Sequence, residues 1–298
     1  MVQQTRAGLN WRDYGGSGPT MVLVHGLGGS LIDWEAVGPK LARHHRVVAL
    51  DLPGFGLSPP RRDFRMTTHV AAVVDFIESF EAPVTLMGNS MGGLVCELLA
   101  AEYPDLLDHL ILVAPATPLR IPDPRLDWPT VTRLAIEATP GVGYAFGQFV
   151  KWRYDPEEIV HLGLSAITHD PARVPPEVVA SFVELARERI TYPWTIPAMN
   201  QTAFSVARIY RRPRDYVRMI RKIRARTLVV HGVDDRIVSP TAVEWLTSLR
   251  TDWTLTQMED TGHTPQLDAP VRFVKVVEDW LGGFRETGQN AKRATSLT

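Results

Sequence analysis

The amino-acid sequence predicts an α/β fold: a mostly parallel sheet with helices on both faces and a helical insert. Short apolar segments of strand length alternate with segments of helical periodicity as far as Ala114, and again from Thr227. This alternation is typical of a parallel sheet covered on both faces. Between these parts, residues 115–215 hold 13 of the 23 prolines of the chain, which breaks this segment into short helices and turns.

The elements follow from local signals in chain order. An entry strand ends in the glycine-rich turn at residues 15–19, Asp33 and Thr67 can cap helices, and β-branched runs mark the buried strands. The expected strands are Leu9–Tyr14, Met21–Val24, Arg46–Leu50, Pro83–Met87, His109–Val113, Thr227–Val230 and Trp253–Met258. The expected helices are Asp33–Ala42, Thr67–Phe80, one directly after Ser90, and Leu134–Ala138, Glu157–Ile167, Glu177–Ile190 and Ala198–Tyr210 in the insert.

The most informative segment is Gly88-Asn89-Ser90-Met91-Gly92-Gly93, which joins an expected strand to an expected helix. The pattern G-x-S-x-G in this context predicts a sharp turn with a serine at its apex. Side chains at the flanking positions would clash with neighbouring backbone, so both positions are glycine. The turn would expose the Ser90 hydroxyl at the positive end of a helix, as a nucleophile requires.

A serine hydroxyl needs a base and an acid, and both candidates lie downstream of Ser90. Asp235 follows the expected strand at Thr227–Val230, and His263 follows the last expected strand. Imidazole can remove the hydroxyl proton near neutral pH, and a carboxylate can fix its tautomer and stabilise the imidazolium. We therefore expect Ser90, His263 and Asp235 to form a catalytic triad.

Five motifs in order make the chain resemble the α/β-hydrolase family over about residues 8–282. Besides the Ser90 turn, they are His25-Gly26-Leu27-Gly28-Gly29, the loop at residues 51–58, the Gly232 to Asp235 loop, and Gly262-His263. The resemblance implies an eight-stranded sheet with a helical cap inserted after the sixth strand. It also implies that the backbone amides of Leu27 and Met91 form the oxyanion hole. Removing one donor from such a site typically lowers the rate roughly 100- to 1000-fold.

The same resemblance implies the domain organisation. Residues 1–114 and 216–286 would form the core and residues 115–215 a cap over Ser90, while the polar, aperiodic residues 287–298 predict a disordered tail. A cap of this kind shapes the acyl pocket and excludes water. The candidates for substrate contact are Trp128, Phe146, Trp152 and Trp194.

Some assignments have alternatives. Asp234 adjoins Asp235 but fits the spacing from Gly232 less well, so we expect a solvated or salt-bridged loop residue, and Asp123 is a more distant choice for the acid. His25 and His231 precede glycines at strand ends, where they would bind loop backbone. His69, in the second expected helix, is expected at the surface. The nine basic residues between Arg208 and Arg226 are expected on a solvated helix face.

Composition excludes several classes of function. With 298 residues, 45% hydrophobic residues, 22% charged residues and a net charge of −1, the chain is expected to be an ordinary globular protein with no drive toward nucleic acid. No apolar run is long enough for a transmembrane helix, and the N-terminus resembles no signal peptide, so we expect a cytoplasmic protein without stable membrane insertion. The single cysteine, Cys96, is expected to be buried. No cofactor or metal is implied, and oligomeric state is not indicated.

The expected function is hydrolysis of carboxylic esters with small to medium, fairly apolar acyl groups, so the expected partner is a small-molecule ester. Hydrolysis of a C–C bond in ring-cleavage diketones is an alternative, because such enzymes share the Gly-Asn-Ser-Met-Gly-Gly turn. Thr264 after His263 and Leu27-Gly28-Gly29 depart from their pattern. An anionic diketone would need a cap arginine such as Arg187, Arg189 or Arg208. Lactonase, perhydrolase and slow-hydrolysing receptor roles also fit this triad.

Overall fold

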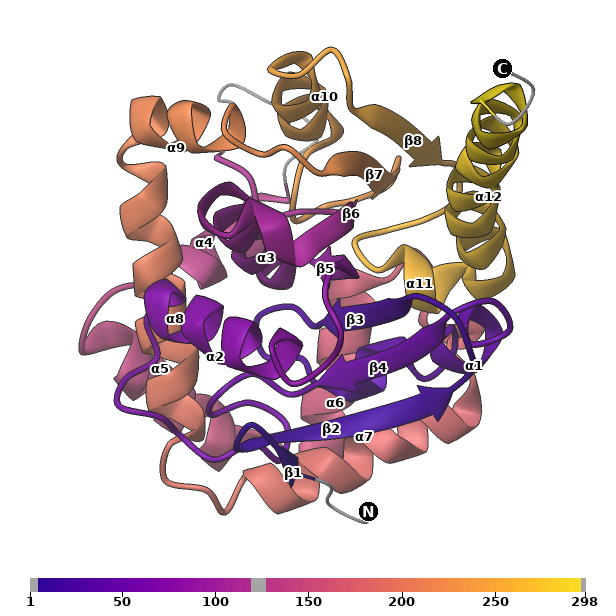
Figure 1. Ribbon diagram of the computed structural model, residues 1–298. Coiled ribbons are helices and arrows are strands. Elements are labelled where there is room, and N and C mark those ends of the chain that lie inside the picture. The colour runs from indigo at the N-terminus through magenta and orange to yellow at the C-terminus, as the bar shows by residue number, and fades with distance from the viewer. Residues whose placement is uncertain (1–4, 119–126, 296–298) are drawn as a thin grey trace.

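The computed structural model describes residues 5–118 and 127–295, which form a sheet with helices on both faces and a helical insert on one side (Figure 1). The eight strands are β1 Thr5–Arg6, β2 Leu9–Gly15, β3 Thr20–Val24, β4 Arg46–Leu50, β5 Val84–Asn89, β6 Leu107–Val113, β7 Arg226–Gly232 and β8 Thr254–Met258. Their order is β1-β2-β4-β3-β5-β6-β7-β8. Pairs β1–β2 and β2–β4 are antiparallel, and the others are parallel. The predicted eight-stranded, mostly parallel sheet is confirmed.

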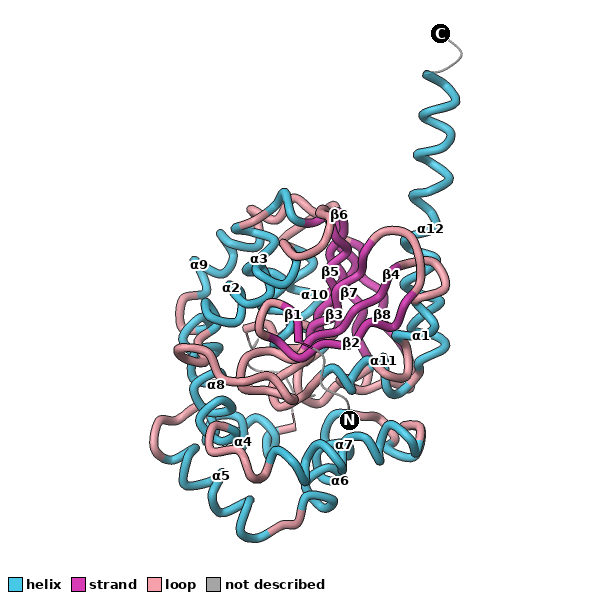
Figure 2. The backbone as a smooth tube through the Cα atoms, turned by 60° about the horizontal axis from the view of Figure 1, so that its bottom comes forward, coloured by secondary structure: helices cyan, strands magenta, loops and turns pink. Residues whose placement is uncertain are grey.

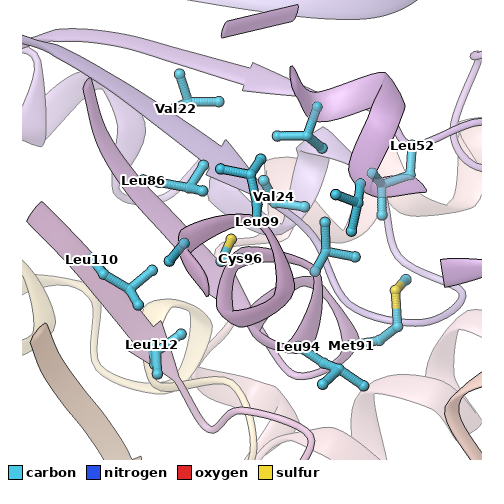
Figure 3. Close-up of a cluster of buried hydrophobic side chains, with 14 of the residues drawn as sticks. Val22, Val24, Leu52, Leu86, Met91, Leu94, Cys96, Leu99, Leu110 and Leu112 are labelled. Carbon is cyan, nitrogen blue, oxygen red and sulfur yellow. The ribbon is translucent and has the colours of Figure 1, made fainter. Parts of the chain in front are cut away.

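Alternation along the strands divides the core into two clusters. Val22, Leu86 and Leu110 face helices α2 (Met66–Ile77), α3 (Met91–Glu102), α9 (Pro213–Ile220) and α10 (Pro240–Ser248). Figure 3 shows side chains of this cluster from the strands and from α3, among them Leu86, Leu110 and Leu99. The neighbouring residues Leu23 and Met87 belong to the second cluster, with residues of α1 (Gly38–Leu41), α11 (Pro265–Asp268) and α12 (Pro270–Thr295). The sheet is therefore buried on both sides, as its apolar strands require.

The insert lies between β6 and β7 and is helical. Its helices are α4 Trp128–Glu137, α5 Val142–Arg153, α6 Pro156–Ile167, α7 Pro176–Arg189 and α8 Thr195–Tyr210, with the short 3₁₀ helix η3 Pro171–Arg173 between α6 and α7. Figure 2 shows α4–α7 gathered on one side of the sheet, with α5 at the outer end. The chain then returns through α9, which packs on the core through the buried residues Tyr216 and Ile220, while the basic residues around them face solvent as predicted.

Two local expectations differ from the structure. The helix expected at Asp33–Ala42 is divided into the 3₁₀ helix η1 (Leu31–Trp34) and α1, because Gly38 and Pro39 interrupt the hydrogen-bonding pattern. Helix α12 extends to Thr295, where a disordered tail was expected from residue 287; helix formers such as Gln289, Ala291 and Lys292 continue a helix already anchored by Phe273 and Val277, despite Gly288 and Asn290. Residues 296–298 lie outside the described part.

Helix α5 was not expected, because Gly143 and Gly147 lower its intrinsic propensity. Tertiary packing explains it. A Cβ atom on Gly143 would lie 2.8 Å from Nδ2 of Asn200, and one on Gly147 would lie 2.7 Å from Cγ2 of Ile196. The two glycines therefore form the face on which α8 packs, and close helix contact compensates for the weak propensity.

A buried carboxyl group in α3 gives the fold a testable pH dependence. Glu97 is fully buried, accepts a hydrogen bond of 3.0 Å from the Tyr216 hydroxyl, and burial raises its pKa to about 8. Because the folded pKa lies above the ordinary value of 4.5, the folded state binds the extra proton. The resulting stability is fully present below that ordinary value and is lost as pH rises through about 8.

We therefore expect Glu97→Gln, which cannot ionise, to flatten the dependence of melting temperature on pH. The melting temperature of the variant should rise relative to that of the wild type as pH rises from about 5 to 9. Only the wild type must keep a proton on a buried carboxyl group, which becomes more costly as pH rises. Differential scanning fluorimetry across this range measures the effect. Glu102→Gln, at an exposed position of the same helix, is the control and should follow the wild type. Parallel curves for Glu97→Gln and wild type would contradict the prediction.

Candidate active site

The turn from β5 into α3 holds Ser90 in an uncommon backbone conformation. Its φ of 53° and ψ of −119° lie outside the regions that ordinary residues adopt. A Cβ atom on Gly88 would lie 2.6 Å from Sγ of Cys96, and one on Gly92 would lie 2.5 Å from the carbonyl oxygen of Val24. Both positions thus require glycine, as the sequence predicts, and the tight packing keeps Ser90 at the apex.

His263 and Asp235 meet at the ends of β8 and β7. Nδ1 of His263 lies 2.8 Å from Oδ2 of Asp235, while Oδ1 of Asp235 accepts hydrogen bonds from the backbone amides of Ile237 and Val238 at 2.8 and 2.9 Å. Burial alone would raise the pKa of Asp235, but His263 and the Val238 amide, with a contribution from His231, hold it below its ordinary value. The carboxylate is therefore ionised and fixed in orientation.

Asn89 connects the Ser90 turn to the histidine loop. Its Nδ2 donates to the carbonyl oxygens of Val113 and His263, at 3.0 and 3.2 Å. The backbone amide of Ser90 donates to the same Val113 carbonyl at 2.9 Å. Strand β6 therefore fixes the turn, and the neighbour of Ser90 ties it to the backbone of His263. The sequence motif contains Asn89, but nothing in its pattern indicates this role.

The loop at residues 25–30 lies against the Ser90 turn. A Cβ atom on Gly26 would lie 3.3 Å from Cβ of Ser90, so Leu27 follows directly on the point of contact. His25 fixes this loop: its Nδ1 lies 2.7 Å from the Gly26 carbonyl oxygen, and its Nε2 accepts from the Leu52 amide at 3.0 Å. Burial lowers the pKa of His25 to about 3. His25 therefore binds loop backbone as a neutral ring, as expected.

Two buried carboxyl groups, those of Asp51 and Asp33, lie next to this loop. Asp51 accepts hydrogen bonds from the side chain of Asn10 and from the amides of Leu31 and Leu57, at 2.7, 2.7 and 2.8 Å. Asp51 therefore has a structural role in holding these loops together. A Cβ atom on Gly29 would lie 3.1 Å from Cγ of Asp33, and burial raises the pKa of Asp33 to about 7.

The alternatives separate clearly in space. Asp234 pairs with His169, Oδ2 to Nδ1, at 3.0 Å on the surface, as expected of a salt-bridged loop residue. Asp123 lies outside the described residues. His231 was expected to bind backbone, but its Nε2 lies 3.7 Å from Oδ2 of Asp235. His69 was expected at the surface but is buried, because α8 covers α2 and places the Thr202 hydroxyl 3.0 Å from the His69 ring.

Two of the four residues expected to contact substrate lie at the surface of the insert. Trp128 is 52% exposed and Trp152 is 80% exposed, so neither lines an enclosed pocket. Trp152 lies on α5, whose glycine face turns inward toward α8 and leaves this side chain outward, whereas Trp128 is the first residue of α4 and is exposed there. Phe146 and Trp194 are half-buried, and Trp194 packs against the first core cluster together with Leu27 and Met199. Met199 Cε would lie 3.4 Å from a Cβ on Gly28, so α8 reaches the loop at residues 25–30.

The insert also brings one cationic side chain to this loop. Nη1 of Arg189, at the end of α7, donates to the Gly28 carbonyl oxygen at 3.2 Å, and the guanidinium carbon lies 5.7 Å from the Phe55 ring centroid. Nε of Arg189 is buried and has no hydrogen-bond partner among the described residues. Arg187 instead extends to Glu157 at 3.5 Å, and Arg208 is exposed. Of the three candidate arginines, only Arg189 contacts this loop.

A family model described as alpha/beta hydrolase fold matches residues 19–270. The chain belongs to this family. As an alpha/beta hydrolase, it has relatives with different reactions. It is 28% identical over 273 residues to the 2-hydroxy-6-oxo-6-(2'-aminophenyl)hexa-2,4-dienoic acid hydrolase of Metapseudomonas resinovorans, covering 89% of this chain and 85% of the relative. It is 26% identical over 272 residues to the pimeloyl-[acyl-carrier protein] methyl ester esterase of Aeromonas hydrophila, covering 90% and 97%.

Solved structures agree on the fold of this alpha/beta hydrolase. A thermophilic esterase from Thermogutta terrifontis superposes with a TM-score of 0.71 at 24% identity, covering 92% of this chain and 93% of the other. Among the helices of residues 5–118 and 127–295, none combines the length and apolarity that a bilayer crossing requires.

Proposed function

We propose that this alpha/beta hydrolase is a serine hydrolase that cleaves carboxylic esters of small to medium, fairly apolar acyl groups. The observation that carries the proposal is the 2.8 Å contact of His263 with a buried, ionised Asp235, beside the turn that presents Ser90. Because Nδ1 of His263 faces the carboxylate, Nε2 is the atom available to exchange a proton with Ser90. Relatives that include an ester hydrolase support the reaction class.

In the proposed reaction, Oγ of Ser90 attacks the ester carbonyl while Nε2 of His263 takes its proton. The imidazolium then returns this proton to the departing alcohol oxygen as the C–O bond breaks, which leaves an acyl-Ser90 ester. Water attacks this ester with the same assistance and releases the carboxylic acid. Asp235 stabilises the imidazolium in both steps without taking the proton itself.

The oxyanion would bind the backbone amides of Leu27 and Met91. Neither amide donates to another group within the described residues, so both are available for a ligand. Met91 is the first residue of α3, where amides point out of the helix and its dipole favours negative charge. The contact of Gly26 with Ser90 brings Leu27 to the same place. In this proposal the insert is the cap. Met199 of α8 and Trp194, which directly precedes this helix, line the part of the pocket that holds the acyl group.

Turnover of p-nitrophenyl esters from acetate to decanoate, by wild type and by Ser90→Ala, tests the proposal. We expect Ser90-dependent hydrolysis with an optimum at one chain length, because the cap limits the acyl pocket. Negligible turnover by a folded wild type across the series would contradict ester hydrolysis.

Arg189 favours a second candidate, C–C bond hydrolysis of an anionic ring-cleavage diketone. Its guanidinium, held at Gly28 with Nε unpartnered, has donors left for a substrate carboxylate. Two relatives named as hydrolases of such dienoates support this candidate.

If the substrate is anionic, Arg189→Ala should raise KM for a 2-hydroxy-6-oxo-dienoate about 100-fold, since a charge-assisted pair contributes roughly 1.5–3 kcal/mol. The effect on a neutral ester should be far smaller. Arg187→Ala, which removes only an exposed arginine paired with Glu157, is the matched control and should leave both substrates unaffected. Equal effects of Arg189→Ala on the two substrates, or no dienoate turnover by the wild type, would exclude this candidate.

A further inference from the structure

The carboxylate of Asp268, the last residue of α11, lies buried between the core and the insert. It is 4% exposed. Oδ2 accepts from the Gly262 amide at 2.8 Å, and both oxygens accept from the His169 amide, at 2.9 and 3.1 Å. The Asp170 amide completes the set at 3.5 Å. Burial raises the pKa of Asp268, and these amides oppose the rise. Within the described part of the chain, it forms no ion pair with a cationic side chain, so backbone amides hold the charge, and the nearby His169 side chain contributes to its stabilisation.

These amides come from two separate segments. Gly262 directly precedes His263, whereas His169 and Asp170 belong to the segment of the insert that runs from the last residue of α6 to the end of η3, which we call the clasp loop (residues 167–173). A Cβ atom on Gly262 would lie 2.8 Å from the His169 nitrogen and 2.9 Å from the Thr168 carbonyl carbon. The two backbones are therefore in direct contact, and the Asp268 carboxylate accepts the hydrogen bonds of the amides that converge there.

The residue after His263 contacts the same loop. The amide of Thr264 donates to the Ile167 carbonyl oxygen at 3.2 Å, and its hydroxyl donates to the same oxygen at 3.1 Å. Both neighbours of His263 are thus bound on the clasp-loop side: Gly262 through Asp268, and Thr264 directly. The carbonyl of His263 itself is held from the opposite side by Asn89.

Two outer contacts continue the clasp loop onto neighbouring core loops. Nη1 of Arg173 donates to the Asp260 carbonyl oxygen at 2.7 Å, and the His169 ring pairs with Asp234, next to Asp235. These side chains are 31–41% exposed, whereas Asp268 is enclosed. Water can replace the outer contacts at little cost, but it cannot easily replace a buried carboxylate.

We propose that Asp268 is a positioning residue, which locks the histidine loop to the insert so that the His263 ring keeps its alignment with Asp235 only while the clasp loop is in place. This inference rests on the proposed function for its kinetic consequence, but not for its structural one. Loss of the carboxylate leaves the Gly262 and His169 amides unpaired in a buried site, and both segments must shift to find partners. A shift of about 1 Å in a catalytic group can cost roughly 100-fold in rate.

Asp268→Asn is the decisive variant. Each oxygen of Asp268 accepts from an amide, so either orientation of asparagine turns an NH₂ group toward a backbone donor. We expect kcat per active site on the best p-nitrophenyl ester to fall about 100-fold with KM changed much less, and the acidic limb of the kcat/KM pH profile to move to lower pH. Normalisation to burst amplitude separates this from a simple loss of folded enzyme.

A second readout does not depend on turnover. The proton shared by His263 and Asp235 gives a low-field NMR resonance, which His263→Ala assigns by its disappearance. Asp268→Asn should broaden or shift this resonance, even if no ester is a substrate. Arg173→Ala, which removes only an outer contact of the clasp loop, is the control and should preserve it. Should Asp268→Asn not fold, Asp268→Glu carries the test, because it keeps the charge but displaces it. An unchanged resonance and a kcat per active site within twofold of wild type would overturn the proposal.

Discussion

Replacing Ser90 by alanine is expected to remove ester turnover almost completely, by about a millionfold in kcat, while leaving the fold intact. Alanine can occupy the same strained conformation, because Gly88 and Gly92 and the packing around them remain. The Ser90 side chain forms no capping hydrogen bond to α3, so its removal leaves no buried group unpaired there. Intact mass spectrometry after incubation with a slowly hydrolysed ester should detect an acyl adduct in the wild type and none in the variant.

Ser58 provides the opposite control. Its hydroxyl donates to the Asp51 carbonyl oxygen at 2.7 Å and accepts from the Asn10 amide at 2.8 Å, in a buried site away from Ser90. Ser58→Ala should therefore lower the melting temperature and retain turnover. Ser90→Ala should instead keep the melting temperature and lose turnover. Turnover by Ser90→Ala within tenfold of wild type would remove Ser90 from the mechanism.

The second large effect is expected at Asp235. Asp235→Asn should lower kcat by about 10⁴-fold, because an amide can present NH₂ to Nδ1 and so favour the wrong tautomer of His263. The two amides of Ile237 and Val238, which donate to Oδ1, reinforce this outcome, since they hold the asparagine oxygen and direct its NH₂ group at His263.

Asp234→Asn is the matched control, with the same substitution one residue earlier. Its side chain is 41% exposed and pairs with His169 at the surface, an interaction worth at most about 1 kcal/mol. We expect turnover within about threefold of wild type, measured with the same ester. The reverse ranking of the two variants would assign the acid to Asp234.

Sequence patterns predicted the parts of this molecule that local rules determine. Strand β4 was expected at its observed bounds, because Arg46–Leu50 is a short β-branched run between polar segments. The Ser90 turn followed from its two glycines, each of which lies where a side chain would clash. The meeting of His263 with Asp235 was expected because both follow strands of a parallel sheet, and the carboxyl ends of such strands share one edge.

Features that depend on tertiary packing were missed. Helix α5 has weak propensity and exists through its contact with α8, so Trp152 was assigned to a pocket and instead faces solvent, as does Trp128 at the start of α4. Asp268 lies five residues after His263 in an ordinary-looking segment, and only the approach of residues 167–170 gives it partners. Arg189 was one of three candidate arginines in the sequence, and only the packing of α7 and α8 places it, rather than Arg187 or Arg208, against the loop at residues 25–30.

The buried position of Cys96 allows its thiol to report on local opening of the structure. This thiol is fully buried, its pKa is raised well above the usual value by burial, and it packs directly under Gly88. A thiol reagent can therefore modify the chain only when α3 lifts from β5, and the labelling rate counts these openings. Because no other cysteine competes, a single colorimetric trace records how often the packing of α3 against β5, which holds the Ser90 turn, opens in urea, in heat or with an inhibitor bound.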